Sequence, residues 1–310
     1  MENRHYPGDL EQMQSLPLSA KISMSLTRIR DWYNAFDGEV YVSFSGGKDS
    51  TALLHLVRRF YPDVEAVFVD TGLEYPEIRD FVKTVSNVTW LKPEMNFKAV
   101  IKKYGYPVIS KAVAHSVSVA KRNPDGAVAK NLFNPEKKGP YAMHKWSYLL
   151  DAPFDVSEKC CNVMKKKPAQ DYTKRTGKKP IVGTMACESI ARKTQWMRYG
   201  CNAFDTAHPT SHPLSFWTEQ DVLEYISTNG LPYASVYGDI VQDSTGKWIT
   251  TGVERTGCMF CMFGVQCEKA PNRFQQMKET HPKQYDFCMR SVECGGLGLS
   301  DVLQYIGVKH

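Results

Sequence analysis

The feature that most constrains this 310-residue chain is an alternation of short apolar strands with helical segments near its N-terminus. Residues 39–44 (EVYVSF) and 65–72 (EAVFVDTG) are rich in β-branched and aromatic residues, and a third strand is predicted at 87–93. Helical patterns at 50–61 and 76–85 separate these strands. Consecutive strands joined by single helices run parallel. The sequence therefore predicts an α/β fold with a twisted parallel sheet and helices on both of its faces.

Three segments are expected along the chain. Residues 1–37 form an N-terminal helical segment with a break near Pro17, 38–230 contain the sheet, and 231–310 form a loop-rich, cysteine-bearing part. Further predicted elements are a long surface loop at 121–145, a strand at 178–186, a helix at 218–230 capped by Thr218, and short C-terminal helices at 272–281, 283–291 and 300–307.

Composition excludes two classes of protein. No stretch approaches the roughly 20 apolar residues of a membrane-spanning helix, so we expect no membrane association. The N-terminal sequence MENRHYPGDL lacks the apolar core of a secretory signal, so we expect a cytoplasmic protein. In that compartment the 9 cysteines favour metal or redox chemistry over a disulfide framework. The net charge of +6 favours anionic ligands.

A glycine-rich turn joins the first strand to its helix. Glycines allow backbone N–H groups to approach an anion, and the helix N-terminus that follows favours negative charge. Lys48 adds a positive charge, whereas Asp49 would repel phosphates unless a cation lies between them. Asp49 therefore implies either Mg²⁺ or a positioning role that avoids the phosphates. Because Asp49 follows the lysine, this is not a Walker A loop. The candidate anion-binding residues are Ser43, Ser45, Gly46, Gly47, Lys48, Asp49 and Ser50.

This SFSGGKDS loop, followed by VDTGLEYPE, resembles the PP-loop ATP pyrophosphatase superfamily, in the branch of the phosphoadenosine phosphosulfate (PAPS) reductases and the small subunit of ATP sulfurylase. The resemblance continues through GTMACESIARK (183–193) and HPLSFWTEQDVLEYI (212–226) and covers roughly residues 38–265. It implies an adenine nucleotide α-hydrolase-like, Rossmann-like fold in which 38–230 is the nucleotide-binding domain and ATP is the ligand. Besides the loop, it places Asp70, Thr71, Gly72, Glu188, Ser189 and Arg192 beside the nucleotide.

Two departures from the family pattern affect the expected activity. The second motif begins Gly183-Thr184-Met185, where the family has Gly-x-Arg, so one basic contact is missing. Sulfonucleotide reductases tend to lose the Gly-Gly-Lys-Asp-Ser form of the loop, because their substrate has no β,γ-pyrophosphate, and this chain keeps it. The resemblance therefore favours cleavage of ATP between its α and β phosphates over reduction of PAPS.

Paired cysteines indicate a metal centre. Cys160-Cys161 is one pair, and Cys258-x2-Cys261 is a second, with Cys267 as a substitute for one of the four positions. Four thiolates suit a [4Fe–4S] cluster or a zinc ion, and free buried or redox thiols are the remaining interpretation. Adjacent cysteines followed by a run of lysines resemble the [4Fe–4S] site of adenosine 5′-phosphosulfate reductases. The spacing through Cys267 resembles the ATP pyrophosphatases of bacterial DNA phosphorothioation systems.

Our principal hypothesis is therefore an ATP pyrophosphatase with an iron–sulfur cluster that works in sulfur transfer. Lys48 would neutralise the leaving pyrophosphate with help from Asp49 and Mg²⁺, and Arg192 would orient the nucleotide. A cysteine desulfurase is the expected type of sulfur donor, and DNA, RNA or a small molecule is the expected acceptor. One alternative is a sulfonucleotide reductase with Cys294, in Glu-Cys-Gly, as its nucleophile. Another is a non-catalytic nucleotide sensor. The oligomeric state does not follow from the sequence.

Overall fold

The computed structural model describes residues 5–136, 139 and 141–310. The chain divides into two compact units, each assembled from segments that are distant in the sequence. Unit 1 comprises Met1–Asp70, Glu74–Lys92 and Ala169–Thr256; unit 2 comprises Thr71–Leu73, Pro93–Pro168 and Gly257–His310. The limits of the units therefore differ from the segment boundaries expected after residues 37 and 230.

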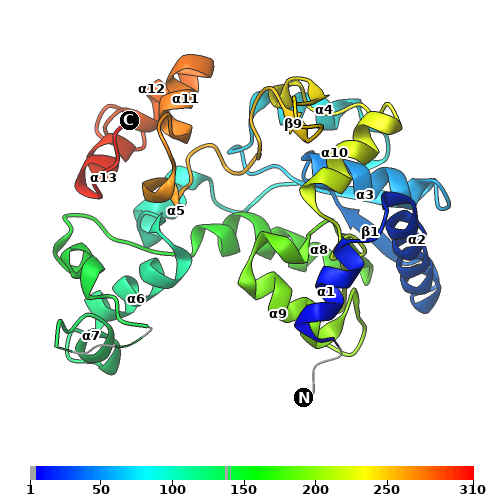
Figure 1. Cartoon of the computed structure of the whole chain (residues 1–310). Coiled ribbons are helices and arrows are strands. Elements are labelled where there is room, and N and C mark those ends of the chain that lie inside the picture. The colour runs from blue at the N-terminus through cyan, green and yellow to red at the C-terminus, as the bar shows by residue number, and fades with distance from the viewer. Residues whose placement is uncertain (1–4, 137–138, 140) are drawn as a thin grey trace. The chain divides into compact units, whose positions relative to one another are not determined.

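In the described part of the chain, unit 1 is built on a six-stranded sheet in the order β3-β2-β1-β5-β7-β6. Strand β1 of this sheet is labelled in Figure 1. Its strands are β1 (Val40–Ser43), β2 (Glu65–Val69), β3 (Val88–Leu91), β5 (Lys179–Val182), β6 (Asn202–Ala203) and β7 (Thr210–Ser211). Neighbours from β3 to β7 are parallel, and β6 is antiparallel to β7 at the edge. The chain leaves β1 toward β2 and later returns to β5 on the other side of β1. This order confirms the expected Rossmann-like α/β fold and adds an antiparallel edge.

Side chains that alternate along β1 pack on opposite faces of the sheet. Val40 and Val42 are buried in the core that also contains residues of α3 (Lys48–Arg58) and α4 (Pro76–Thr84). Tyr41 packs on the other face against Tyr172 of α8 (Lys167–Thr176). Helices therefore cover both faces, as the sequence predicts.

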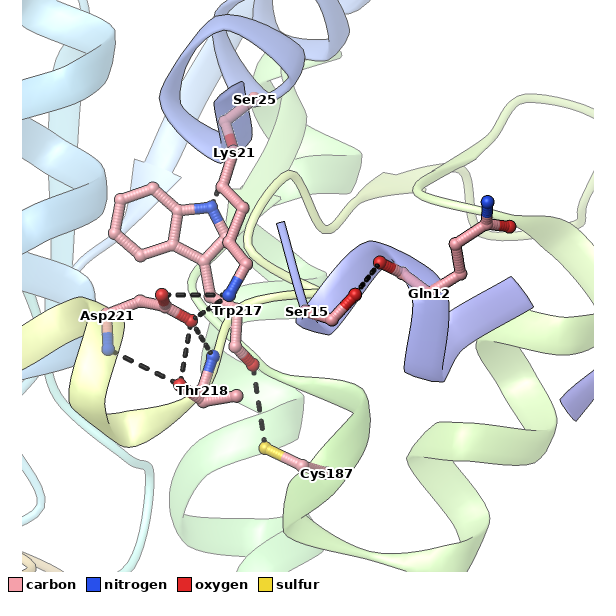
Figure 2. Close-up of polar contacts among 8 residues, drawn as sticks. All are labelled: Gln12, Ser15, Lys21, Ser25, Cys187, Trp217, Thr218 and Asp221. Atoms are coloured by element: carbon pink, nitrogen blue, oxygen red, sulfur yellow. Dashed lines mark hydrogen bonds and ion pairs between the residues drawn. The ribbon is translucent and has the colours of Figure 1, made fainter. Parts of the chain in front are cut away.

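A buried ion pair ties α2 (Leu18–Ala35) to α10 (Glu219–Thr228) (Figure 2). Lys21 Nζ lies 2.7 Å from Asp221 Oδ2, and the two residues are 2% and 7% exposed. The same carboxylate oxygen accepts hydrogen bonds from the backbone N–H and the hydroxyl of Thr218 at 2.6 and 2.7 Å. Trp217 Nε1 donates to Ser25 Oγ at 2.9 Å beside this pair. Thr218 Oγ1 also accepts from the backbone N–H of Asp221 at 3.4 Å, which confirms the predicted N-cap at Thr218.

The remaining elements of unit 1 surround this core. Pro17 separates α1 from α2, which confirms the predicted break in the N-terminal helical segment. The remaining elements of unit 1 are α1 (Pro7–Gln14), η3 (Ala186–Glu188), α9 (Ile190–Tyr199), η4 (Ser235–Tyr237) and the hairpin of β8 (Ile240–Gln242) and β9 (Trp248–Thr250).

Unit 2 is mostly helical, with a small parallel pair in which Val108 lies opposite Met262. The prediction of one long loop over 121–145 is wrong: Gly126 is the N-cap of a short helix that contains two alanines, the residue with the highest helix propensity. Residues 137, 138 and 140 of that range lie outside the described residues.

The elements of unit 2 are α5 (Phe97–Tyr104), β4 (Val108–Ile109), α6 (Lys111–Arg122), α7 (Ala127–Leu132), η1 (His144–Asp151), η2 (Asn162–Lys166), β10 (Met262–Phe263), η5 (Val265–Cys267), α11 (Arg273–Thr280), α12 (Pro282–Met289) and α13 (Leu299–Tyr305).

Among the described residues, no helix combines the length and the apolar character that crossing a membrane requires.

Candidate functional site

The glycine-rich loop lies at the carboxyl end of β1, where the strand order of the sheet reverses. Open α/β sheets bind ligands at this kind of position. Gly46 has φ +72°, and a Cβ there would lie 2.7 Å from Val82 Cγ2, so both the backbone conformation and the space require glycine. Helix α3 begins at Lys48, so its first N–H groups have no acceptors within the helix and face the loop. The position of the loop and its backbone N–H groups together favour the binding of an anion.

Two serines hold the loop in its turn. Ser50 Oγ accepts from the backbone N–H of Ser45 at 3.2 Å and donates to the carbonyl of Gly47 at 2.9 Å. The hydroxyls of Ser45 and Ser50 lie 3.1 Å apart, and Ser45 is exposed. Ser50 is buried and uses its proton within the loop, whereas the exposed hydroxyl of Ser45 can donate to a phosphate oxygen.

Lys48 is buried at the base of the loop with contacts that the sequence motifs did not predict. Its Nζ lies 2.8 Å from Glu219 Oε1 and donates to the carbonyl of Glu254. Its backbone N–H donates to the hydroxyl of Tyr237 at 3.2 Å, which lies 2.6 Å from Thr256 Oγ1. Burial raises the pKa of Tyr237 to about 12, so this hydroxyl keeps its proton at neutral pH. The loop is therefore fixed by Glu219, which lies in the 212–226 motif, and by Tyr237, Glu254 and Thr256, which lie outside the quoted motifs.

Asp49 has an unusual environment for a carboxylate. Its Oδ1 atom is buried and has no hydrogen-bond partner among the described residues. Burial raises the pKa of Asp49, and the positive charges of Lys48, Arg255 and Arg192 oppose this shift. An unpartnered carboxylate oxygen beside an anion-binding loop fits a role as ligand of the Mg²⁺ that accompanies ATP.

The second motif follows the neighbouring strand β5 and packs on the loop. A Cβ at Gly183 would lie 3.1 Å from the carbonyl oxygen of Asp49, so glycine allows this close approach. Glu188 forms ion pairs with Arg192 and, at 3.4 Å, with Arg255. Burial, followed by the nearby charge of Arg255, lowers the pKa of Arg192, which remains far above neutrality as arginine does. Two guanidinium groups thus lie near Asp49.

Two further residues of the second motif, Ser189 and Cys187, make hydrogen bonds of different kinds. Ser189 is the N-cap of α9 and accepts a hydrogen bond from the backbone N–H of Arg192 at 3.3 Å, so it orients the helix that carries this arginine. Cys187 is exposed, and its thiol donates to the carbonyl of Trp217 at 3.6 Å (Figure 2).

The residues predicted at the end of β2 are divided between the two units. Asp70 belongs to unit 1, is 7% exposed and forms an ion pair of 2.9 Å with Arg79 of α4. Thr71 and Gly72 belong to unit 2, where Thr71 Oγ1 accepts from the backbone N–H of Leu73 at 3.2 Å and Gly72 has φ +72°. Ser43 ends β1 directly before the loop. A role for these four residues at the nucleotide stays a prediction.

Four of the five candidate metal ligands line a single pocket in unit 2. Cys160, Cys161, Cys258 and Cys261 line it together with Leu73, Phe97 and Pro107 among others. The backbone N–H of Cys261 donates to the carbonyl of Cys258 at 3.1 Å, so Cys-x2-Cys forms a tight turn. The other pair precedes the π-helical turn η2, a local widening of the helix that is frequent at functional sites. Cys267 is exposed and does not line this pocket.

The donor set of this pocket fits a thiolate-bound metal centre. Among the described residues, no three His, Cys, Asp or Glu side chains have the mutual arrangement of a metal site. The thiol of Cys160 donates to Cys161 at 3.9 Å, and this hydrogen bond lowers the pKa of Cys161, as does the positive charge of Lys111. The pKa of Cys161 therefore favours the thiolate, the form that ligates metals. Four cysteines that line one pocket have the donor chemistry of an iron–sulfur cluster or zinc site, although their side chains are not arranged around a common metal position.

The other cysteines lie elsewhere. Cys201 and Cys288 are buried. Cys294 is exposed between α12 and α13, and its backbone N–H donates to Ser291 Oγ at 3.3 Å. It does not line the cysteine pocket.

Comparison with known proteins gives consistent matches. The model of the phosphoadenosine phosphosulfate reductase domain matches residues 39–108 and 111–262. An uncharacterised protein of Methanocaldococcus jannaschii is 26% identical over 269 residues, which cover 84% of this chain and 50% of that protein, so the chain spans about half the length of this relative. An adenosine 5′-phosphosulfate reductase of Oceanobacillus iheyensis is 24% identical over 250 residues, 75% of this chain and 86% of that one. A Candida auris PAPS reductase structure covers 80% of this chain and 100% of its own, with 16% identity and a TM-score of 0.41.

Proposed function

This chain belongs to the phosphoadenosine phosphosulfate reductase domain family, and within that family we propose that it is an enzyme that cleaves ATP between the α and β phosphates to activate an acceptor for sulfur transfer. The observation that carries the proposal is the intact loop at the carboxyl end of β1, with Lys48 buried beneath it and the serine hydroxyls at its turn. A β,γ-pyrophosphate needs such a loop, whereas a sulfonucleotide has no such group.

The charges around the loop suit a leaving pyrophosphate. An acceptor oxygen forms a bond to the α-phosphorus, and the bond from that phosphorus to the bridging oxygen breaks, so negative charge grows on the pyrophosphate. Lys48 and the N–H groups that begin α3 stabilise this charge, and Arg192 and Arg255 orient the phosphates. Mg²⁺ held by Asp49 would neutralise further charge on the phosphates. A sulfur nucleophile then bonds to the acceptor, and AMP leaves.

The cysteine pocket supports the sulfur chemistry of the proposal. Cys160, Cys161, Cys258 and Cys261 would hold a [4Fe–4S] cluster or, as the alternative, zinc, and Cys267 takes no part. A bound cluster would supply a site that binds sulfur or that accepts and donates electrons. A cysteine desulfurase is the type of donor that we propose, and a nucleic acid is the type of acceptor.

A second candidate, a sulfonucleotide reductase, is favoured by the names of the relatives. Several are adenosine 5′-phosphosulfate reductases, and a phosphoadenosine 5′-phosphosulfate reductase of Alkalilimnicola ehrlichii is 34% identical over 76 residues. In this reading the substrate is a sulfonucleotide, and sulfite and a nucleotide are the products. Two electrons from a dithiol of the thioredoxin type would be consumed.

One experiment separates the two candidates. Protein purified without oxygen is incubated either with α-labelled ATP and Mg²⁺ or with adenosine 5′-phosphosulfate, PAPS and a thioredoxin-type dithiol. We expect AMP from ATP, with little ADP, and no sulfite from either sulfonucleotide. Sulfite without AMP from ATP would reject the ATP pyrophosphatase and establish the reductase.

A further inference from the structure

We propose that unit 2 carries a second binding site, for the sugar–phosphate backbone of a nucleic acid. The site is a pocket between the C-terminal ends of α5 and α6 and the segment 155–159, here called the basic pocket. If the proposed function holds, this inference names nucleic acid as the class of acceptor. Only that identification rests on the proposed function, because binding of a nucleic acid can occur without ATP cleavage. The residues that define the basic pocket are Lys103, Tyr104, Lys121, Arg122, Asp155 and Lys159.

An aromatic ring holds two of the ammonium groups at the rim of the pocket. Lys103 Nζ lies 5.3 Å and Lys159 Nζ 5.1 Å from the centroid of the Tyr104 ring. Both lysines are exposed, and each is attracted to the electron-rich face of the ring. Two flexible side chains from distant positions are thereby gathered at one place, which lowers the entropy that they lose when an anion binds.

The other two cations keep hydrogen-bond donors for a ligand. Lys121 Nζ donates to the carbonyls of Ala152 and Phe154 at 2.9 and 3.1 Å, which leaves one of its three N–H groups. Arg122 Nε donates to the carbonyl of Ser118 at 3.0 Å, so both terminal nitrogens of its guanidinium remain for phosphate oxygens. The backbone contacts fix these side chains without neutralising them.

The charge of the basic pocket is not balanced by the protein. In the part of the chain that the structure describes, Lys103, Lys121, Arg122 and Lys159 form no ion pair, and Asp155 is the one carboxylate that lines the pocket. The like charges repel one another, and a bound anion would relieve this repulsion.

The distribution of the cations favours a polyanion over a single small anion. Lys103 and Lys121–Arg122 lie in the last turns of α5 and α6, where the helix dipole is negative and gives no help to an anion. The attraction therefore comes from side chains on three separate segments. Successive phosphates of one strand can contact cations from several segments, whereas one phosphate group can contact only some of them.

The test measures binding without ATP, so that its outcome is independent of ATP cleavage. The full chain is titrated against a fluorescein-labelled 20-nucleotide single-stranded DNA, the matching RNA, the duplex DNA and a poly-glutamate peptide, at several salt concentrations. The double variant Lys103→Gln/Lys159→Gln is compared with Lys278→Gln/Lys283→Gln, which has the same charge change at exposed lysines of unit 2 outside the pocket.

We expect the wild type to bind at least one nucleic acid, and the pocket variant to bind about tenfold more weakly at about 0.1 M salt. For the pocket variant, the slope of log K against log salt concentration should become less steep by about 0.7 to 0.9 for each phosphate contact that is lost. The control variant should bind within about twofold of wild type. Equal losses in both variants, no loss in the pocket variant, or no binding of nucleic acid by the wild type would overturn the proposal. Equal binding of poly-glutamate through the same lysines would also overturn it, in favour of an acidic protein partner.

Discussion

The ammonium of Lys48 lies 2.8 Å from the carboxylate of Glu219, the first residue of α10. Lys48 is buried, whereas the side chain of Glu219 is 45% exposed. The lysine that the loop motif assigns to phosphate therefore already has an anionic partner within unit 1. A nucleotide phosphate must share this ammonium with Glu219 or displace the glutamate from it.

Replacing this partner should strengthen nucleotide binding. In Glu219→Gln the ammonium of Lys48 no longer interacts with a competing carboxylate, so the KM for ATP should fall by about twofold to fivefold, as expected for a half-exposed ion pair worth at most about 1 kcal/mol. The measurement is the initial rate of AMP formation against ATP concentration. Glu224→Gln on the same helix is the control and should behave as wild type. A higher KM in Glu219→Gln would show that the glutamate positions Lys48 for the nucleotide.

Asp49 should make stability depend on pH in a direction opposite to that of most carboxylates. Burial raises its folded-state pKa above the unfolded value, so the folded protein retains the proton to higher pH. The associated stability is present below the unfolded pKa and is lost as pH rises through the folded pKa. Asp49→Asn should therefore have a higher Tm than wild type at pH 8, and this difference should shrink as the pH is lowered toward 4.

Thermal unfolding over pH 4 to 8 measures this difference, with Asp63→Asn at an exposed position as the control. The same Asp49→Asn variant should lose Mg²⁺-dependent AMP formation, because the amide is a poorer cation ligand. Equal Tm differences at pH 4 and pH 8 would contradict the assignment of a raised pKa.

The sequence predicted the sheet and the loop well because both have local signals. Strands alternate with helices at a regular spacing, and the loop SFSGGKDS is contiguous. The partners of Lys48 gave no such signal: Glu219 and Tyr237 reach it through tertiary packing of segments distant from the loop in sequence, and Thr256 contacts Tyr237. The adjacency of Thr256 to the Cys-x2-Cys motif was the available hint.

The division into two units was also beyond sequence patterns. Unit 2 receives residues from three separated segments, so no composition boundary marks it. The short strands β4 and β10, two residues each, are too brief for a period of two to be recognised. The helix α7 was missed because polar residues surround its short alanine-containing core.

The ion pair between α2 and α10 should contribute strongly to folding. Lys21 and Asp221 are both buried, so Lys21→Met leaves a carboxylate without its charge partner and should lower the free energy of unfolding by about 3–5 kcal/mol. Urea unfolding of Lys21→Met, Asp221→Leu and the double variant measures this effect. The double variant should lose less than the sum of the single variants, and strict additivity would argue against direct coupling.

Metal content should depend on the four cysteines of the pocket and not on the fifth. We expect Cys161→Ser and Cys258→Ser, purified without oxygen, to lose most of the bound iron or zinc, because a cluster or closed site needs all four thiolates. Cys267→Ser should retain it, since Cys267 lies outside the pocket and is exposed. Elemental analysis and absorption spectra provide the readout. If Cys267→Ser loses the metal while Cys161→Ser and Cys258→Ser retain it, Cys267 is a ligand and the two pocket cysteines are not.

The most direct test of the central claim is the stoichiometry of AMP and pyrophosphate formed from α-labelled ATP by wild type and by Lys48→Met. Lys83→Met, an exposed lysine on α4, is the control. Our account predicts AMP and pyrophosphate in equal amounts from wild type and the control, and a rate lower by about 10²–10³ in Lys48→Met, as for loss of one group that stabilises the leaving charge. Formation of ADP, or AMP formation unchanged in Lys48→Met, would contradict the assignment of this loop as the site of α,β cleavage.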